Sequence, residues 1–231
     1  MARLADFDKA TTRRLLVSLM RAGLVEQNSD TRKYRLGAAI LRLAHVREET
    51  FPVASVVKPV LQGLTQATGE TSHFSLLTEQ SLQTTEIENS SKTISVNVDY
   101  SQPLPLHCTA SGIAVLSYQS AEKVRRVLGR RLKVFTENTV VDPEQIRKNL
   151  AAARSQGYGY VDSGFESGVC GLAAAVFDSS GYACGAVAVA TPVSRMHEKQ
   201  FELTRQAVRR AAIEITRAFG AQPDREFMSA A

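Results

Sequence analysis

The stretch FDKATTRRLLVSLMRAGLV, residues 7–25, is the part of the sequence from which the fold of the first domain follows. Apolar side chains recur in it at the spacing of one helix face, while the basic residues point largely elsewhere. Asp8 is suited to cap the start of a helix, and Gly23 is suited to end it. We therefore predict an amphipathic helix over residues 9–22. Its apolar positions are Leu15, Leu16, Leu19 and Met20.

A short hairpin is predicted directly after this helix. The segment LVE (24–26) is followed by the polar turn NSDT (28–31) and the alternating stretch KYRL (33–36). A helix followed by a basic-tipped hairpin is how a winged helix ends. In that fold the helix reads base edges in the major groove, and the wing contacts a phosphate or the neighbouring minor groove. The pattern therefore favours binding to double-stranded DNA.

The charge distribution agrees with this interpretation. The 231 residues carry a net charge of +5, from 28 basic and 23 acidic side chains. Residues 1–50 contain ten basic and six acidic side chains, so a surplus of +4 lies there and only +1 in the remainder. A basic segment ahead of a near-neutral body favours contact with a polyanion. A solvated helix face that happens to be basic is the alternative.

Composition excludes several classes of protein. With 44% hydrophobic and 22% charged residues, the sequence is typical of a globular protein. It has no apolar run of the roughly 18–20 residues that a membrane span needs, and no signal-peptide pattern. The three cysteines form no pair that suggests a disulfide framework or a zinc site. The common nucleotide-binding glycine loops are missing too. We therefore expect a cytoplasmic protein with no cofactor and no membrane partner.

The remaining pattern runs in blocks of one helix, three strands, further helices, three strands and a last helix, which is an α+β order built on an antiparallel sheet. Residues 38–49 predict a linker helix that stops before Pro52, and residues 51–68 a helix with a kink or late start at Pro59. Further helices are predicted at 121–128, 142–156 and 197–219. Strands are predicted at 71–77, 82–87, 94–98, 158–165, 172–177 and 183–190.

Four stretches together resemble one known family. They are residues 7–25, KYRLG (33–37), PLHCTASG (105–112), and GVCGLAAAVFD (168–178) with AVAVATP (186–192). They are similar, in order, to the recognition helix, the second wing strand, the P-L-H block and the closing strand pair of IclR-type transcriptional regulators. The resemblance implies a winged helix-turn-helix, a linker helix and a GAF- or PAS-like domain that binds a small-molecule effector. It also implies a homodimer or a dimer of dimers.

The sequence departs from the family pattern at three places. Only about six residues precede the recognition helix where the family has two helices, so we expect the true start to lie upstream. Ile113 occupies a position where the family often has lysine. The family's usual cysteine falls on Gly171, with Cys170 one place earlier. The alternative to a complete DNA-binding regulator is a dimerisation module that senses an effector but has impaired direct DNA contact.

The expected fold class is α+β, with a partial winged helix-turn-helix and a six-stranded, mainly antiparallel sheet flanked by helices. The expected domains are a winged helix (1–37), a linker helix (38–52), an effector domain (53–221) and a flexible tail (222–231).

Among DNA contacts, we expect Thr11, Thr12 and Arg13 to read bases, because the start of a recognition helix enters the groove first. Lys9, Arg14, Arg32 and Lys33 are expected to contact phosphates.

The TASG segment, residues 109–112, predicts an effector pocket. It opens a helix whose free backbone amides and Ser111 hydroxyl can hold a carboxylate. The alternative is that small residues here only permit close helix packing. We expect an apolar opposing wall and therefore an aromatic or mid-sized apolar acid. The segments that carry Phe74, Tyr100, Tyr158 and Tyr160 are expected to border the cavity. The residues expected at the pocket are His107, Ala110, Ser111, Gly112, Val161, Asp162, Cys170, Gly171, Ala188 and Ala190.

The His107-Cys108 pair permits an alternative interpretation as a thiol enzyme. Adjacent residues of an extended segment usually point to opposite sides, however, and no partner that would orient the histidine is evident. We therefore expect Cys108 to be a buried structural thiol and the protein not to be an enzyme.

Overall fold

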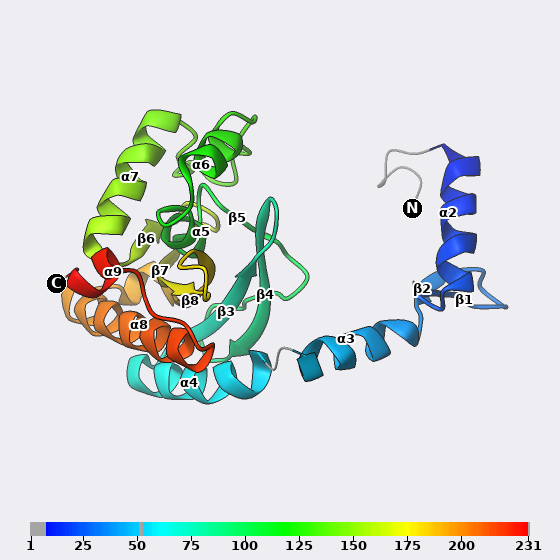
Figure 1. Cartoon of the computed structure of the whole chain (residues 1–231), viewed down its shortest axis with the longest axis horizontal. Helices are drawn as coiled ribbons and strands as arrows, with labels where there is room; N and C mark the ends of the chain where they lie inside the picture. The colour runs from blue at the N-terminus through cyan, green and yellow to red at the C-terminus, as the bar shows by residue number, and fades with distance from the viewer. Residues whose placement is uncertain (1–7, 51–52, 231) are drawn as a thin grey trace. The chain divides into compact units, whose positions relative to one another are not determined.

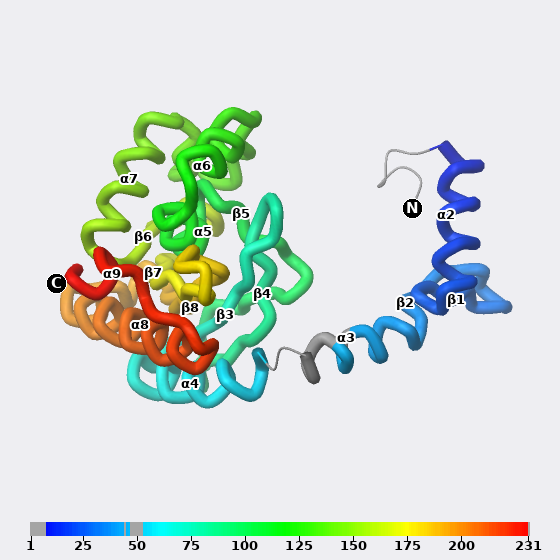
Figure 2. The backbone as a smooth tube through the Cα atoms, viewed as in Figure 1, coloured from blue at the N-terminus to red at the C-terminus, as the bar shows by residue number. Residues whose placement is uncertain are grey.

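A computed structural model of the chain describes residues 8–50 and 53–230. It consists of two compact units, Met1–Val53 and Ala54–Ala231, which Figures 1 and 2 show in the same view. Expectations about residues 1–7, about Phe51 and Pro52, and about Ala231 lie outside the described residues.

The first unit contains the predicted helix and hairpin. Helix α2 spans Lys9–Arg21, and its start is capped by the Asp8 carboxylate, which accepts hydrogen bonds from the Ala10 and Thr11 amides. Gly23 ends the helix with a φ of 69°, a conformation that glycine adopts without steric cost. Strands β1 (Val25–Gln27) and β2 (Tyr34–Leu36) then pair antiparallel, and helix α3 (Ala39–Thr50) follows. The predicted helix and hairpin are confirmed.

The second unit is built on a six-stranded sheet in which every neighbouring pair of strands is antiparallel. The strand order is β5-β4-β3-β8-β7-β6, so strands from the two halves of the domain meet where β3 pairs with β8. Most residues of β7 and β8 are buried, because helices cover both faces of the sheet. The strands are β3 (Thr71–Leu77), β4 (Ser81–Glu88), β5 (Leu104–Pro105), β6 (Gly159–Asp162), β7 (Val169–Phe177) and β8 (Ala183–Pro192). The expected sheet is confirmed.

Helices flank this sheet as expected (Figure 1). Helices α4 (Val53–Thr68) and α8 (Glu198–Ala218) cover one face, and α5 (Ala110–Leu116) packs on the other against β6, β7 and β8. Helix α7 (Pro143–Gln156) packs beside α5 and β6, and α6 (Ala121–Leu128) and the 3₁₀ turn η1 (Val193–Arg195) complete the domain. Helix α4 runs through Pro59, so the expectation of a late start there is wrong.

Two expectations for the irregular parts of the domain need correction. Residues 94–98 form no strand. The Thr71 hydroxyl donates a hydrogen bond to the Val96 carbonyl at 2.9 Å, so a side chain of β3 contacts this segment. The sixth strand is instead β5, whose second residue, Pro105, is the first residue of the PLHCTASG block. The described part of the expected flexible tail, residues 222–230, contains helix α9 (Arg225–Ser229), and Phe227 in it is fully buried. Phe227 packs edge-to-face on Tyr118 and Phe177.

Candidate functional site

The exposed surface of α2 carries cations without ion-pair partners. Lys9, Arg13 and Arg14 are exposed, and no ion pair among the described residues involves them. The hydroxyls of Thr11 and Thr12 are engaged in the helix cap: Thr11 donates to the Asp8 carboxylate at 2.7 Å and Thr12 to the Asp8 carbonyl at 2.9 Å. The bonds from Thr11 lower the pKa of Asp8. Of the three expected base readers, Arg13 therefore has the freest polar group.

The turn of the hairpin is held rigidly by one side chain. The Asn28 carboxamide oxygen accepts hydrogen bonds from the Asp30 amide and from the amide and hydroxyl of Thr31. This network places Arg32 in the left-handed region, with a φ of 56°, which is uncommon for a residue with a side chain. Arg32 and Lys33 are exposed at this tip.

Arg35 differs from its neighbours in the hairpin because it is already neutralised. Its guanidinium lies 2.9 Å from the Glu26 carboxylate across the strand pair. No ion pair among the described residues involves Arg32 or Lys33. Among the described residues, the hairpin thus presents two cations outside any ion pair at its tip and a paired one on its strand.

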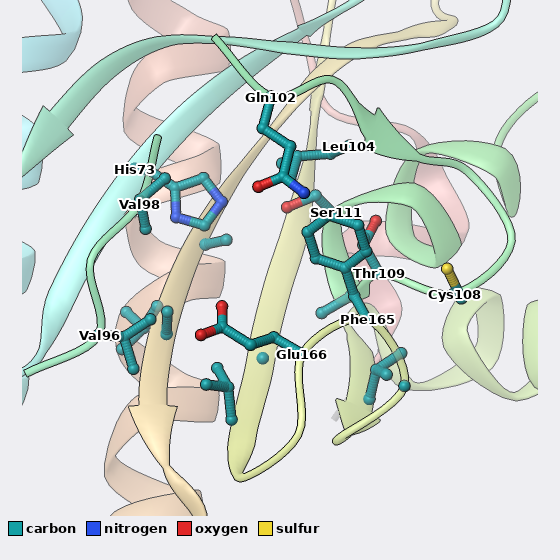
Figure 3. A pocket seen from close by; sticks show the side chains of 18 of the residues that line it. His73, Val96, Val98, Gln102, Leu104, Cys108, Thr109, Ser111, Phe165 and Glu166 are labelled. Atoms are coloured by element: carbon teal, nitrogen blue, oxygen red, sulfur yellow. The ribbon is translucent and has the colours of Figure 1, made fainter. Parts of the chain in front are cut away.

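The second unit contains a cavity of about 90 Å³ between the start of α5, the sheet and two loops (Figure 3). A cavity of this size holds several water molecules or one small organic molecule. Its floor is formed by Ala188 and Ala190 of β8, Gly171 of β7 and His73 of β3. Residues 96–104 and 164–169 form its sides.

The cavity brings together six of the ten residues expected at the effector pocket. These are Ala110, Ser111, Val161, Gly171, Ala188 and Ala190. The other four, His107, Gly112, Asp162 and Cys170, do not line it. His107 faces a neighbouring groove, where its Nε2 lies 3.0 Å from the Lys133 carbonyl oxygen. Cys170 lies on the opposite side of β7 from the cavity-lining Gly171, with Sγ 3.5 Å from the Tyr160 hydroxyl.

Small residues at the start of α5 also serve packing, as the alternative interpretation held. Ala110 and Ala114 pack on Ala173 and Ala188 of the sheet. A Cβ on Gly112 would lie 2.6 Å from the backbone of Leu106, so that position cannot accommodate a side chain without movement. Gly112 therefore allows α5 to pack closely on the backbone of Leu106, although it does not itself line the cavity.

Residues outside the ten expected ones complete the cavity. The most informative is His73, which is 7% exposed and has no hydrogen-bond partner on either ring nitrogen. Burial lowers its pKa to about 4, so its ring is neutral at physiological pH. An unpartnered buried imidazole costs free energy unless a bound molecule satisfies it. The further lining residues are Val96, Asn97, Val98, Asp99, Gln102, Leu104, Cys108, Thr109, Gly164, Phe165, Glu166, Val169 and Val189.

The segments of Phe74, Tyr100 and Tyr160 contribute residues to the cavity, but the four named aromatic side chains do not line it. Phe74 follows His73 on β3, points to the opposite face of the sheet and packs on Phe219. Tyr158 and Tyr160 pack on Phe201 of α8. The aromatic side chain at the cavity is instead Phe165, on a loop that the sequence pattern did not distinguish. Because side chains of a strand alternate between its two faces, the sequence could have shown that His73 and Phe74 lie on opposite faces of the sheet. It could not have shown which of the two faces the cavity.

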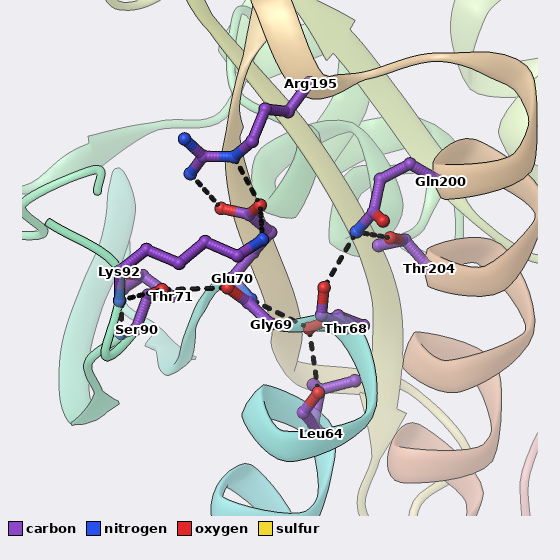
Figure 4. Close-up of polar contacts among 10 residues, drawn as sticks. All are labelled: Leu64, Thr68, Gly69, Glu70, Thr71, Ser90, Lys92, Arg195, Gln200 and Thr204. Atoms are coloured by element: carbon purple, nitrogen blue, oxygen red, sulfur yellow. Dashed lines mark hydrogen bonds and ion pairs between the residues drawn. The ribbon is translucent and has the colours of Figure 1, made fainter. Parts of the chain in front are cut away.

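A polar cluster anchors one loop that borders the cavity (Figure 4). The Glu70 carboxylate is fully buried and accepts hydrogen bonds from Arg195 and Lys92. Burial works to raise the pKa of Glu70, but these two cations outweigh it, so the pKa lies below its ordinary value. Lys92 opens the segment that continues into the cavity wall at Val96, so the cluster ties this wall to the sheet.

The geometry at Cys108 does not support a thiol enzyme. Cys108 lines the cavity whereas His107 faces the neighbouring groove, so the two side chains diverge. Burial raises the pKa of Cys108 to about 12, which keeps the thiol protonated and non-nucleophilic at neutral pH.

Within the described residues there is no group of three or more potential metal ligands. No helix in that part of the chain is long and apolar enough to cross a membrane.

A helix with a basic wing, joined in one chain to a domain with a ligand-sized cavity, defines an effector-responsive DNA-binding regulator. Comparisons with known proteins agree. Residues 48–217 match the family model described as the bacterial transcriptional regulator IclR C-terminal domain, and residues 1–29 match the IclR helix-turn-helix domain. The chain belongs to the IclR family of bacterial transcriptional regulators, whose C-terminal domain binds an effector.

Individual relatives are similar over nearly the whole chain. The transcriptional repressor IclR of Escherichia coli is 27% identical over 95% of this chain and 81% of its own length. A crystal structure of an IclR transcriptional regulator from a Silicibacter species is 39% identical and superposes with a TM-score of 0.92, covering 98% of this chain and 89% of that one. These relatives are regulators and not enzymes.

One further solved relative contains a bound ligand. An IclR homologue from Microbacterium hydrocarbonoxydans, in complex with 4-hydroxybenzoate, is 25% identical with a TM-score of 0.78. That match covers 95% of this chain and 89% of the homologue.

Proposed function

We propose that this regulator binds its operator through α2 and the hairpin tip, and that a small organic acid in the cavity controls that binding. The observation that carries the proposal is the unpartnered His73 in the cavity floor, since a buried imidazole without a partner indicates a site that a ligand completes. The protein would act in the cytoplasm, where its DNA lies.

The acid group of the effector would lie at the start of α5. Ser111 is buried there beside the cavity, and the Ala110 and Ser111 amides belong to the first turn of the helix, where backbone N–H groups lack helical partners. The apolar floor of Ala188 and Ala190 suits the body of an aromatic or mid-sized acid. The complex of a relative with 4-hydroxybenzoate supports this class of ligand.

On the DNA side, Arg13 would read a base, and Lys9, Arg14, Arg32 and Lys33 would contact phosphates. Thr11 and Thr12 would contact the operator mainly through their methyl groups, because their hydroxyls bond to Asp8. A pseudo-palindromic operator requires a two-fold protein, so we propose a homodimer as the binding unit. The match of residues 1–29 to the helix-turn-helix model favours direct DNA contact over a dimerisation module that lacks it.

The test begins with native mass spectrometry of the protein purified from its own host, which reports the subunit number and any retained small molecule. Operator fragments selected from that genome are then used in fluorescence-anisotropy titrations with and without 4-hydroxybenzoate or the retained molecule. Ala190→Leu, which fills the cavity floor, should keep DNA affinity but lose the response to ligand. Ala151→Leu, at an exposed position on α7, is the matched control. An unchanged response in Ala190→Leu would place the effector elsewhere.

A further inference from the structure

We propose that the effector carries an amine-type cationic group in addition to its acid group, and that this amine binds between Glu166 and His73. The inference rests on the proposed function, because it names the ligand class of the same cavity. It distinguishes a zwitterionic or amino-bearing acid from a plain organic acid.

The charges around the cavity carry the first step. Two acidic residues, Asp99 and Glu166, are among the residues that line the cavity, and this lining contains no lysine or arginine among the described residues. Hydrogen bonds from Ser101 lower the pKa of Asp99, which keeps that carboxylate ionised. A plain organic anion would therefore gain no ion pair from a lysine or arginine of the lining and would approach the like charge of the Glu166 carboxylate. A positive group on the ligand would instead be attracted to the acidic lining.

The position of His73 carries the second step. The Glu166 carboxylate and the His73 ring extend from opposite sides into the same part of the cavity (Figure 3). A neutral imidazole offers one acceptor nitrogen and one donor. Because an ammonium group has three donors and no acceptor, it can bond to the His73 acceptor and the Glu166 carboxylate together. This arrangement would satisfy the acceptor nitrogen that has no partner in the protein.

The two ends of the cavity thus differ in the groups that they offer. The start of α5 presents backbone amides and the Ser111 hydroxyl, which can donate to an acid group. The other end presents Glu166 and the neutral His73, which can accept. A ligand with an acid group and an amine separated by an apolar body matches both ends.

The experiment is isothermal titration calorimetry on the full chain with two probes that differ in one group. These are 4-(aminomethyl)benzoate and 4-methylbenzoate. We expect the amino probe to bind at least about tenfold more tightly, because it alone forms the Glu166 and His73 contacts. Glu166→Gln should lower the affinity for the amino probe by about two- to fivefold, as is usual for a partly exposed ion pair. The affinity for 4-methylbenzoate should stay the same or rise. Glu137→Gln, at an exposed position outside the cavity, should change neither affinity.

His73→Leu provides a second variant that keeps the packed volume. His73→Leu should lower the affinity for the amino probe by a larger factor than the affinity for 4-methylbenzoate. The inference would be overturned if 4-methylbenzoate bound the unmodified protein as tightly as the amino probe or more tightly. It would also be overturned if the ratio of the two affinities were the same in Glu166→Gln as in the unmodified protein. Proton uptake when 4-methylbenzoate binds, measured in buffers of different ionisation enthalpy, would show that His73 becomes the counter-ion of a plain acid instead. In each of these cases the cavity would remain the effector site. If neither probe binds and Ala190→Leu leaves the DNA response unchanged, the proposed function fails as well.

Discussion

Glu70 and Arg195, separated by 125 positions in the chain, form a two-point ion pair in which Nε and one terminal nitrogen of the guanidinium lie 2.7 and 2.6 Å from the two carboxylate oxygens. Lys92 donates to the same carboxylate at 2.7 Å. The pair joins the start of β3 to the turn that follows β8, and Lys92 adds the loop that continues into the cavity wall. A single buried carboxylate therefore holds three segments together.

Glu70→Gln should destabilise the protein by about 2 kcal/mol, because an amide cannot accept the paired donors of Arg195 and leaves two cations without a counter-charge. Arg195 and Lys92 keep 28% and 42% of their side chains exposed, which holds the loss below that of a fully buried pair. Urea unfolding measures the change, with Glu137→Gln as the exposed control. A loss below about 0.5 kcal/mol would show that the cluster does not stabilise the fold.

His73 should make the unliganded protein less stable in mild acid. Burial lowers its pKa from an ordinary 6.5 to about 4, so between these values the unfolded chain binds a proton that the folded chain does not. Stability should therefore fall as the pH drops from 6.5 to 4, by up to about 1.4 kcal/mol per unit. His73→Leu should remove this slope and raise stability near pH 7 by about 1 kcal/mol. Urea unfolding at several pH values measures the pH dependence of the stability. The same dependence in both proteins would show that His73 is not the group responsible.

Arg32 and Lys33 should each contribute about one unit to the salt dependence of DNA binding. Substituting either residue by alanine should weaken binding across sequences, as expected for phosphate contacts. Arg32→Gly removes the charge but suits the left-handed φ of 56°, so it should lower the salt slope as Arg32→Ala does while preserving the turn. Anisotropy titrations from 50 to about 200 mM salt provide the slopes. Lys148→Ala on α7 is the control, and an unchanged slope in the wing variants would mean that the tip does not contact DNA.

Cys108 should react slowly with alkylating reagents in the folded protein. Its pKa is raised to about 12 by burial, so the thiolate is scarce at neutral pH. Iodoacetamide at pH 7.5 should modify it at least about tenfold more slowly than in the urea-unfolded chain, as followed by peptide mass spectrometry. Rapid and selective modification of the native protein would revive the thiol-enzyme interpretation.

Phe227 should be essential to the stability of the effector domain although it lies near the end of the chain. Its ring is fully buried, with centroids 5.4 Å from Phe177 and 5.9 Å from Tyr118. Phe227→Ala should cost about 3 kcal/mol in urea unfolding, because it empties a filled position in the core. Met228→Ala, at a side chain that is 47% exposed, should cost much less. Similar values for the two variants would show that α9 is not docked in solution.

Local sequence patterns predict most of the elements correctly because their signals act over a few residues. Asp8 and Gly23 mark the ends of α2, and Asp142 with Gly157 marks the ends of α7 in the same way. The pattern fails at residues 94–98 and 222–231 because distant partners decide the structure there. The Thr71 side chain bonds to the first segment, and Phe227 of the second packs on Phe177 in the aromatic core.

The sequence by itself determined the two-part organisation, the family and the small-residue wall of the cavity at Ala110, Ala188 and Ala190. These features depend on periodicity, on local capping and on motifs that are contiguous in the chain. Only the tertiary structure decided that His73 and Glu166 share one cavity while His107 and Cys170 face away from it. The reason is that the side chains of a strand alternate between its two faces, and only the pairing of β3 with β8 settles which face meets α5.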